Sequence, residues 1–501
     1  YGLFGELYHY PAGMHKKGTL IDIHEWDTGK YLGQIAQARQ TYNVIGNMNE
    51  FQLTIGETTF GGRPELVDTT GIIDYGSLIY LGLQRSRTAR EAIKVMTELV
   101  QEYGYYSGGE SFTIADPNEI WIMEMIGKGP GVRGAVWVAV RVPDDCISAH
   151  ANQSRIHQFN MNDKENCMYS PDVISFAREK GYFDGVNKDF SFANAYAPLD
   201  FGARRYCEAR VWSYFNMFTD RGNEFLPYIL GETNTPMPLF VKPNRKVSVQ
   251  DVKNAMRDHY EGTPLDISKD FGAGPYHTPY RLSPLSFKVG DREYFNERPI
   301  STQQSGFVFV AQMRSELPDP IGGVLWFGTD DANMTVFTPV YCCTDKVPVC
   351  YTRVDGADYI TFSWNSAFWI FNWVANMVYP RYDLMMGDVR ATQTELETTF
   401  NEAQEGVEAA AAKLLEKDPA KAKAFLTNYT NMTAQSTFDT WKRLGEFLVV
   451  KYNDGVVKRM KNGQFERNSI GQPAGVIRPG YPKEFLEEYV KQTGDRYKMP
   501  E

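Results

Sequence analysis

The sequence of 501 residues is 43% hydrophobic and 23% charged, as expected for a soluble globular protein with enough material for a large core. It has 52 Lys and Arg against 62 Asp and Glu, and the net charge of −10 argues against nucleic acid or an anionic membrane as a general partner. The longest uncharged stretch, residues 359–380, carries three asparagines at helical spacing, which predicts a buried aromatic helix and no membrane span.

The first 60 residues predict strands. Alternation of apolar and polar side chains favours a strand at 18–26. Residues 42–48 and 51–57 predict a hairpin around Asn49 and Glu50.

Two helices and three strands are predicted next. The first helix covers 71–83, and the second begins at a capping box of Thr88 and Glu91 and stops at Gly104. The strands are predicted at 110–115, 119–125 and 135–142. Strands followed by helices and more strands predict helices packed on an antiparallel sheet.

The rest of the chain is mixed and then helical. Residues 203–218 and 249–260 predict helices, and strands at 306–313, 324–327 and 334–340 could extend the same sheets. In the last third, helices are predicted at 359–379, from a cap at Thr392 and Glu395 to a stop before Pro419, at 438–450 and at 484–491.

Polar side chains concentrate in residues 46–63. This stretch brings together Asn47, Asn49, Glu50, Glu57, Thr58, Thr59 and Arg63, ahead of and beside a glycine pair. A strand that ends in such groups delivers them to one point, which is how a site is built at the end of a buried sheet. A polar β-turn without chemistry is the alternative interpretation.

Several common kinds of site lack support. The adjacent acids Asp144–Asp145 and Asp330–Asp331 would point apart on a strand, so we interpret them as solvated turn residues. Residues 127–131 are glycine-rich but lack phosphate-loop spacing, and they predict a hairpin loop. We interpret the nearness of His150 to Ser154 as a coincidence of one loop.

The cysteines and histidines predict no metal site. The six cysteines include no C-x-x-C pair, and the seven histidines include no pair at helical spacing. Cys343 and Cys350 could form a disulfide across a short loop, which would imply an oxidising compartment, or they could be free and buried. We expect no metal and no cofactor.

Amide hydrolysis by an N-terminal nucleophile is a further possibility. Such a site needs a free α-amine as the base, a thiol or hydroxyl beside it, and donors for the oxyanion. Asn152 lies just past a buried strand and carries a suitable NH₂ group. Thr59 or its backbone N–H could supply the second donor.

The chain resembles the cysteine dipeptidases of the N-terminal-nucleophile (Ntn) hydrolase superfamily, the dipeptidase A type, which are related to penicillin V acylase and bile salt hydrolase. The motifs that carry the resemblance are residues 46–50 (GNMNE), 55–63 (IGETTFGGR), 86–92 (SRTAREA), 109–116 (GESFTIAD), 120–124 (IWIME), 137–144 (WVAVRVPD) and 149–155 (AHANQSR). The likeness extends to residues 326–328 and to the helix from Ser366, and the motifs are specific as a set.

The resemblance implies an α+β fold, a four-layer αββα Ntn-hydrolase sandwich with a helical C-terminal region. We expect residues 1–355 to form this core, with insertions at about 160–300, and residues 356–501 to pack on it as helices. The implied activity is that of a thiol peptidase that hydrolyses free dipeptides.

The resemblance also implies roles for single residues. A cysteine made N-terminal by processing would attack the carbonyl carbon, with its own amine as the base. Asn152 matches the asparagine that donates to the oxyanion, and Thr59 lies where the second oxyanion residue is expected. Arg205 or Arg210 is expected to match an arginine of the superfamily site.

The sequence departs from the family in one respect. The nucleophile is expected a short way before Tyr1, with an acidic residue soon after it, and none of the six cysteines is terminal. Either a real N-terminal segment is missing from the chain, which we favour, or the protein is an inactive form. With the segment missing, we expect a gap beside Thr59 and Asn152 where a terminal cysteine would fit.

A dipeptidase must bind a free ammonium and a free carboxylate. Glu57 and Arg63 are candidates for these tasks, with Asn49 and Thr58 as further substrate contacts, although Glu57 and Arg63 could instead pair with each other. The alternatives are an acylase of non-peptide amides or an inactive binding or structural homologue. We expect a homo-oligomer, and both a cytoplasmic and a secreted or periplasmic location stay open.

Overall fold

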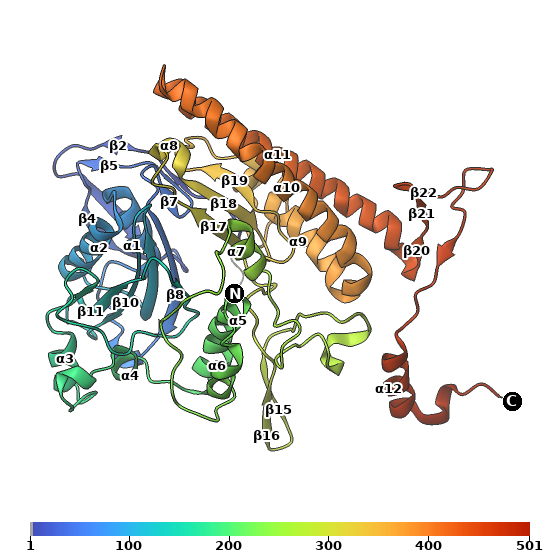
Figure 1. Ribbon diagram of the computed structural model, residues 1–501, viewed down its shortest axis with the longest axis horizontal. Coiled ribbons are helices and arrows are strands. Elements are labelled where there is room, and N and C mark those ends of the chain that lie inside the picture. Colours follow the sequence, from blue (N-terminus) through green and yellow to red (C-terminus); the bar gives the residue numbers. More distant parts are fainter. Residues whose placement is uncertain (1–3, 501) are drawn as a thin grey trace.

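The computed structural model describes residues 4–500 and contains one large antiparallel sheet (Figure 1). Its four long central strands are β8 (Thr54–Gly61), β9 (Gly109–Ala115), β10 (Ile120–Gly127) and β11 (Ala135–Arg141). Four short strands extend it: β1 (His9–Tyr10), β6 (Val44–Ile45) and β7 (Met48–Asn49) beyond β8, and β13 (Cys167–Tyr169) beyond β11. The three predicted strands between residues 110 and 142 are confirmed, because their long apolar runs suit strands that are buried on both faces.

Two helices cover one face of this sheet. They are α1 (Tyr75–Arg85) and α2 (Ala89–Tyr103), and Ile55 and Phe112 of the sheet share a buried core with Leu78 and Met96 of the helices. The side chain of Asp74 caps α1, so this helix starts later than predicted. The side chain of Thr88 caps α2 as predicted.

A second, smaller sheet has three antiparallel strands. They are β17 (Phe307–Gln312), β18 (Val324–Thr329) and β19 (Thr338–Tyr341). The expectation that these strands could extend the large sheet is wrong, since in the described chain they pair only with one another. Ile45 and Met48 of the large sheet share a buried core with Val308 and Val310, so the two sheets are joined through apolar side chains.

Three helices cover the small sheet (Figure 1). They are α9 (Ala367–Val378), α10 (Tyr382–Leu415) and α11 (Pro419–Tyr452). The predicted cap at Thr392 is wrong, because this residue lies inside α10 and donates its hydroxyl hydrogen to the Asp388 carbonyl. Pro419 begins α11 behind the capping side chain of Asp418, so α11 starts well before residue 438.

Shorter elements complete the fold. Before β6 lie β2 (Gly13–Met14), β3 (Leu20–His24), β4 (Tyr31–Ala36) and β5 (Gln40–Thr41). Between the sheets in sequence lie β12 (Ile147–Ser148), α3 (Val173–Glu179), α4 (Phe192–Tyr196), α5 (Ala209–Phe218), α6 (Gly222–Ile229), β14 (Phe240–Val241), α7 (Val249–Ala255), β15 (Ser286–Val289) and β16 (Arg292–Phe295). Helix α8 (Asp319–Gly322) links β17 to β18.

The last 45 described residues run away from the body (Figure 1). They contain β20 (Val457–Lys458), β21 (Met460–Lys461), β22 (Gln464–Phe465), β23 (Val476–Ile477) and α12 (Lys483–Thr493). The predicted domain boundary falls in the short turn Val354–Gly356, and the division into two domains stays a prediction.

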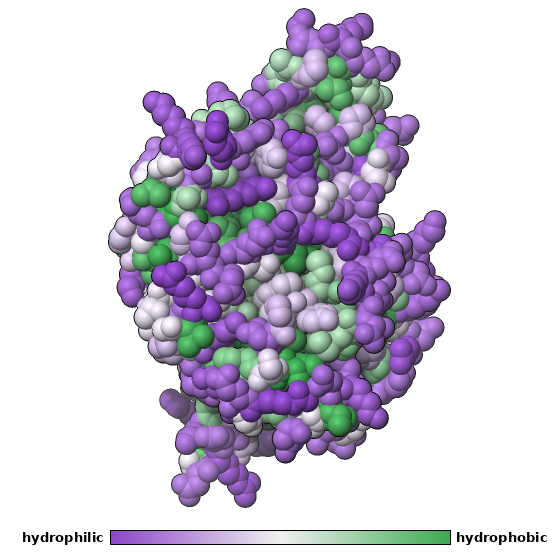
Figure 2. Space-filling model, turned by 90° about the vertical axis from the view of Figure 1, so that its left-hand side faces the viewer, coloured by the Kyte–Doolittle hydropathy of each residue, from purple (hydrophilic) through white to green (hydrophobic). Residues whose placement is uncertain are grey.

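The surface is mostly polar on the side where α2 and α3 lie, with small separate hydrophobic areas (Figure 2). Among residues 4–500, no helix is both long and apolar enough to cross a membrane. The interpretation of Asp330 and Asp331 as solvated is wrong, because both side chains are buried. Asp144 and Asp145 are exposed, as predicted.

Candidate active site

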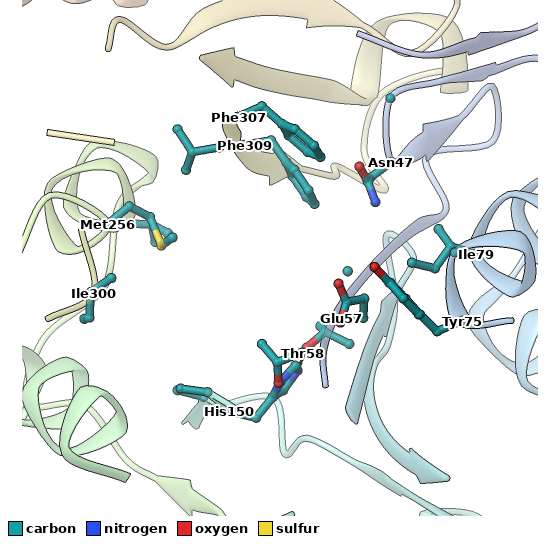
Figure 3. A pocket seen from close by; sticks show the side chains of 18 of the residues that line it. Asn47, Glu57, Thr58, Tyr75, Ile79, His150, Met256, Ile300, Phe307 and Phe309 are labelled. Atoms are coloured by element: carbon teal, nitrogen blue, oxygen red, sulfur yellow. Dashed lines mark hydrogen bonds between the residues drawn. The ribbon is translucent and has the colours of Figure 1, made fainter. Parts of the chain in front are cut away.

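A cavity of about 550 Å³ lies between the two sheets (Figure 3). Glu57 and Thr58 of β8 form one wall, and Tyr75 of α1 stands beside Glu57. Phe307 and Phe309 of β17 form the opposite wall, and further lining comes from Tyr8, Tyr10, Trp26, Asn47, Ile79, Tyr80, His150, Arg210, Tyr214, Met256 and Ile300. A cavity of this volume, with apolar walls and few polar groups, is typical of a small-molecule site.

One edge of β8 is open along this cavity. Strand β7 pairs with β8 only at Met48–Thr54, and from Gly56 onward β9 is the only sheet partner of β8 within residues 4–500. Ile55 bonds to Asn47 on the open side through both its N–H (3.1 Å) and its C=O (2.8 Å). Main-chain groups two and four positions further along a strand face the same side, so those of Glu57 and Thr59 do as well.

Asn152 closes one end of this open edge. Its Nδ2 donates a hydrogen bond of 2.7 Å to the Thr59 carbonyl. Arg210 of α5 holds the other amide atom, because its Nη2 donates to Asn152 Oδ1 at 2.9 Å and to the Ala151 carbonyl at 3.1 Å. The structure thus brings the two predicted oxyanion residues together and fixes the amide in one orientation.

The cavity described above comes close to this pair, and the gap expected for a terminal cysteine stays a prediction. The cavity lining includes Thr58 and Ala151, which are the chain neighbours of Thr59 and Asn152. The side chains of Thr59 and Glu110 lie on the helix-covered face of the sheet, where Thr59 Oγ1 donates to Glu110 Oε1 at 2.6 Å. Thr59 therefore exposes only its main-chain groups at the open edge of β8.

Two neighbouring carboxyl groups lie at another part of the cavity, where Glu57 lines the wall and the buried Glu110 lies behind it. Burial raises the pKa of Glu57, and burial followed by the nearby Glu57 charge raises the pKa of Glu110 well above its usual range. Glu110 is fully buried, so its charged form is costly. Two such acids side by side titrate as a pair, in which burial favours the protonated form of Glu110.

A half-buried histidine braces the cavity wall. His150 Nδ1 lies 2.6 Å from Thr58 Oγ1, and its Nε2 lies 2.7 Å from Thr113 Oγ1. Burial, with a smaller effect from the Arg155 charge, lowers the pKa of His150 to about 4. The ring is therefore neutral near pH 7. Ser154 bonds instead to Glu124, so the two residues share no contact of the serine-hydrolase kind, as predicted.

Three predicted site residues lie elsewhere. Asn49 is buried and donates to the Leu83 and Ser86 carbonyls, as a support of the hairpin. The guanidinium of Arg63 lies 3.8 Å from the Tyr182 ring centroid and bonds to the Ala195 carbonyl, so the alternative pairing with Glu57 is absent from the described chain. Arg205 forms an ion pair with Glu297, whereas Arg210 reaches the cavity.

Weak sequence signals point to two further residues near the cavity. Arg210 is the alternative to Arg205, and its position in the first turn of α5 brings it into contact with Asn152. Glu110 stands in one of the resemblance motifs, but its role depends on lying diagonally across from Glu57 on the neighbouring strand.

The six cysteines are free and lie away from the cavity lining. Burial raises the pKa of each thiol, to about 11 for Cys167 and about 12 for Cys343 and Cys350. A thiol with a raised pKa is a poor nucleophile at neutral pH. In the described residues, no three His, Cys, Asp or Glu side chains form a group that could hold a metal ion.

The sequence model of "Peptidase family C69" matches residues 6–395. The chain belongs to peptidase family C69. The match covers the cavity, both sheets and the start of α10, so the family resemblance inferred from the motifs is confirmed.

Curated proteins similar to this C69 family member carry dipeptidase names. A "Probable dipeptidase" of Salmonella dublin is 30% identical over 326 residues, which are 64% of this chain and 65% of that protein. A "Probable dipeptidase" of Latilactobacillus sakei is 27% identical over 70% of this chain and 66% of its own length. "Dipeptidase A" of Lactobacillus helveticus is 24% identical over 64% of this chain and 60% of its own. The chain thus spans slightly less than two thirds of the length of these relatives.

Proposed function

We propose that this C69 family member is a cysteine-type dipeptidase that hydrolyses the peptide bond of free dipeptides. One observation carries the proposal: the amide of Asn152 is fixed against Thr59 at the open edge of β8, beside a cavity of about 550 Å³. The family membership and the names of the relatives support the same activity.

In the proposed reaction, a thiolate attacks the carbonyl carbon of the peptide bond. Asn152 Nδ2 and the Thr59 N–H then donate hydrogen bonds to the oxygen on which negative charge develops. The amine leaves with a proton from the general base, and water releases the acid from the resulting thioester. Arg210 acts as a positioning residue, since it holds the Asn152 oxygen.

We assign the attacking thiol to a cysteine outside residues 1–501. The six cysteines of the sequence lie away from the cavity and have raised pKa values. An N-terminal cysteine at the open edge of β8 would lie beside Asn152 and carry its own amine as the base.

In this proposal, the protein selects dipeptides by binding both ends of the substrate. The carboxylate of Glu57 accepts hydrogen bonds from the free ammonium group of the substrate. Glu110 lies behind Glu57, and the Tyr75 ring lies beside Glu57. Aromatic walls from Phe307 and Phe309 limit how far the substrate extends. Thr58 and Arg63 stay predicted substrate contacts, and for Arg63 this requires that its side chain leave Tyr182.

We also propose that the fold is the four-layer αββα sandwich of the Ntn hydrolases. The order of the layers supports this fold. Helices α1 and α2 share a core with the large sheet, the large sheet shares one with the small sheet, and helices α9–α11 pack on the small sheet. In such a sandwich the site lies between the sheets, as the cavity does here.

The test uses the protein with the N-terminal cysteine that this proposal assigns to it. Hydrolysis of a panel of free dipeptides, matched with N-acetylated dipeptides and acylated amines, should show turnover of free dipeptides that iodoacetamide abolishes. Faster turnover of acylated amines would favour the alternative acylase. Absence of turnover for every substrate, with a reactive terminal cysteine present, would favour a binding or structural protein.

A further inference from the structure

The final segment of the chain contributes nothing to the core. We define residues 456–500 as the C-terminal arm, which begins just after α11 and ends beyond α12 (Figure 1). None of these residues is buried, although the arm includes a helix of three turns and two short strand pairs. A segment that buries no side chain gains little to offset the entropy of its ordering.

The arm touches the body at few points. The ring of Phe485 on α12 stacks against Phe271 with centroids 6.1 Å apart, and the Tyr276 hydroxyl donates to the Gly480 carbonyl at 2.9 Å. Near its start, Phe465 stacks on Phe447 of α11 at 5.7 Å. These contacts hold the arm near its start and at the beginning of α12, and they involve only one side of that helix.

The open side of the arm is apolar. Leu486, Tyr489 and Val490 form one face of α12 and are 44%, 44% and 59% exposed. Other large apolar side chains of the arm are also exposed, namely Ile470, Ile477, Tyr481, Tyr497 and Met499. Such a concentration in 45 residues indicates a surface that is covered by another molecule.

The net charge of the arm indicates which kind of molecule covers its apolar surface. The arm carries nine basic and five acidic side chains, a net charge of +4, whereas the whole sequence carries −10, so the rest of the chain carries −14. A basic arm on an acidic body is complementary to the body of another copy. An anionic membrane would attract the arm but repel the body that carries it.

We propose that the C-terminal arm docks on the body of a second copy of this chain and thereby forms a homo-oligomer. Apolar side chains of α12 form the centre of the contact. The basic residues elsewhere in the arm meet acidic groups of the partner, since α12 itself carries three acidic side chains and two basic ones. This inference is independent of the proposed catalytic activity.

The first experiment measures the mass of the native protein by sedimentation velocity. The full chain should be oligomeric, and a chain that ends at Gly455 should be monomeric. The truncated chain should still unfold cooperatively as a folded monomer, because the removed residues are not buried within their own chain. A monomeric full chain, or an oligomer that survives the truncation, would overturn the proposal.

Point variants separate the docking surface from the arm as a whole. The double variant Leu486→Glu with Val490→Glu should weaken association at least tenfold. Leu282→Glu is the matched control, since Leu282 is 85% exposed but lies outside the arm, and it should leave the oligomer unchanged. Equal effects of the arm variant and the control would contradict a specific contact.

A cross-linking experiment then tests which chain the arm touches. Heavy-labelled and light-labelled copies are mixed and cross-linked through Lys483 and Lys491 of the arm. Links between the arm of one label and the body of the other support docking on a second copy. Links within one label only, or binding of a monomer to anionic vesicles through the arm, would overturn it.

Discussion

The side-chain amide of Asn152 donates a hydrogen bond of 2.7 Å to the main-chain carbonyl of Thr59. The contact joins residues that lie 93 positions apart, at the one place where β8 has an open edge. Asn152 also has φ of +60°, a left-handed conformation that asparagine adopts more readily than most residues. The backbone and the amide together aim a donor at the cavity rim.

The variant Asn152→Gly tests this donor. Glycine keeps the positive φ without strain, so loss of the amide should lower kcat about 100- to 1000-fold while the protein stays folded. Steady-state kinetics and thermal unfolding measure the two effects. Asn462→Gly is the matched control, because Asn462 has φ of +51° on the exposed arm. Unchanged kcat in Asn152→Gly would remove Asn152 from the mechanism.

Replacement of Glu57 by glutamine tests recognition of the ammonium group. A charged hydrogen bond is worth about 1.5–3 kcal/mol, so Glu57→Gln should raise KM for free dipeptides about tenfold or more. N-acetylated dipeptides lack the ammonium, and their KM should change little. Glu98→Gln, an exposed position on α2, serves as the control. Equal increases in KM for both substrates would contradict the assignment.

The histidine in the cavity wall should stay neutral into the acid range. Its pKa is lowered to about 4, so a proton-detected NMR titration should give a midpoint for His150 near 4. In the unfolded chain, a histidine takes up its proton near pH 6.5. The free energy of unfolding should therefore decrease as the pH falls from 6.5 to 4, by at most about 3 kcal/mol. His24, which is exposed, is the control residue. A midpoint for His150 near 6.5 would contradict burial between Thr58 and Thr113.

Asp330 should destabilise the fold at neutral pH. Burial raises its pKa to about 8, and one carboxylate oxygen has no hydrogen-bond partner in the described chain. Because the unfolded side chain ionises near pH 4, stability should fall as the pH rises from 4 to 8. The penalty is up to about 5 kcal/mol by the same relation.

Asp330→Asn should remove most of this penalty. The amide oxygen can still accept from Asn372, and asparagine tolerates the φ of +68°. The gain in free energy of unfolding, measured with urea, should therefore grow from pH 4 to pH 8. Asp144→Asn, at a largely exposed side chain, should show no such trend. A gain that does not depend on pH would show that ionisation of Asp330 is not its cause.

Much of the fold could be predicted from local patterns. Strands β9, β10 and β11 and helix α2 are confirmed because each carries a long periodic run between clear stop signals. The prediction that a helix begins at Thr392 is wrong, because threonine also occurs inside helices. There its hydroxyl donates a hydrogen bond to a carbonyl of the preceding turn. Whether strands join one sheet or two depends on pairing between distant parts of the chain. In this protein β17, β18 and β19 pair with one another and form a separate sheet.

The site divides in the same way. The sequence by itself placed Glu57, Thr59 and Asn152 on segments that end buried strands, and its motifs determined the family. Only the tertiary structure decided that Arg210 and not Arg205 reaches Asn152, because the π-helical turn Ala203–Glu208 sets the rotation of α5. It also decided that Glu110 lies beside Glu57 and that Arg63 does not. The direction of a side chain depends on strand register and helix rotation, and both are fixed by packing between distant parts of the chain.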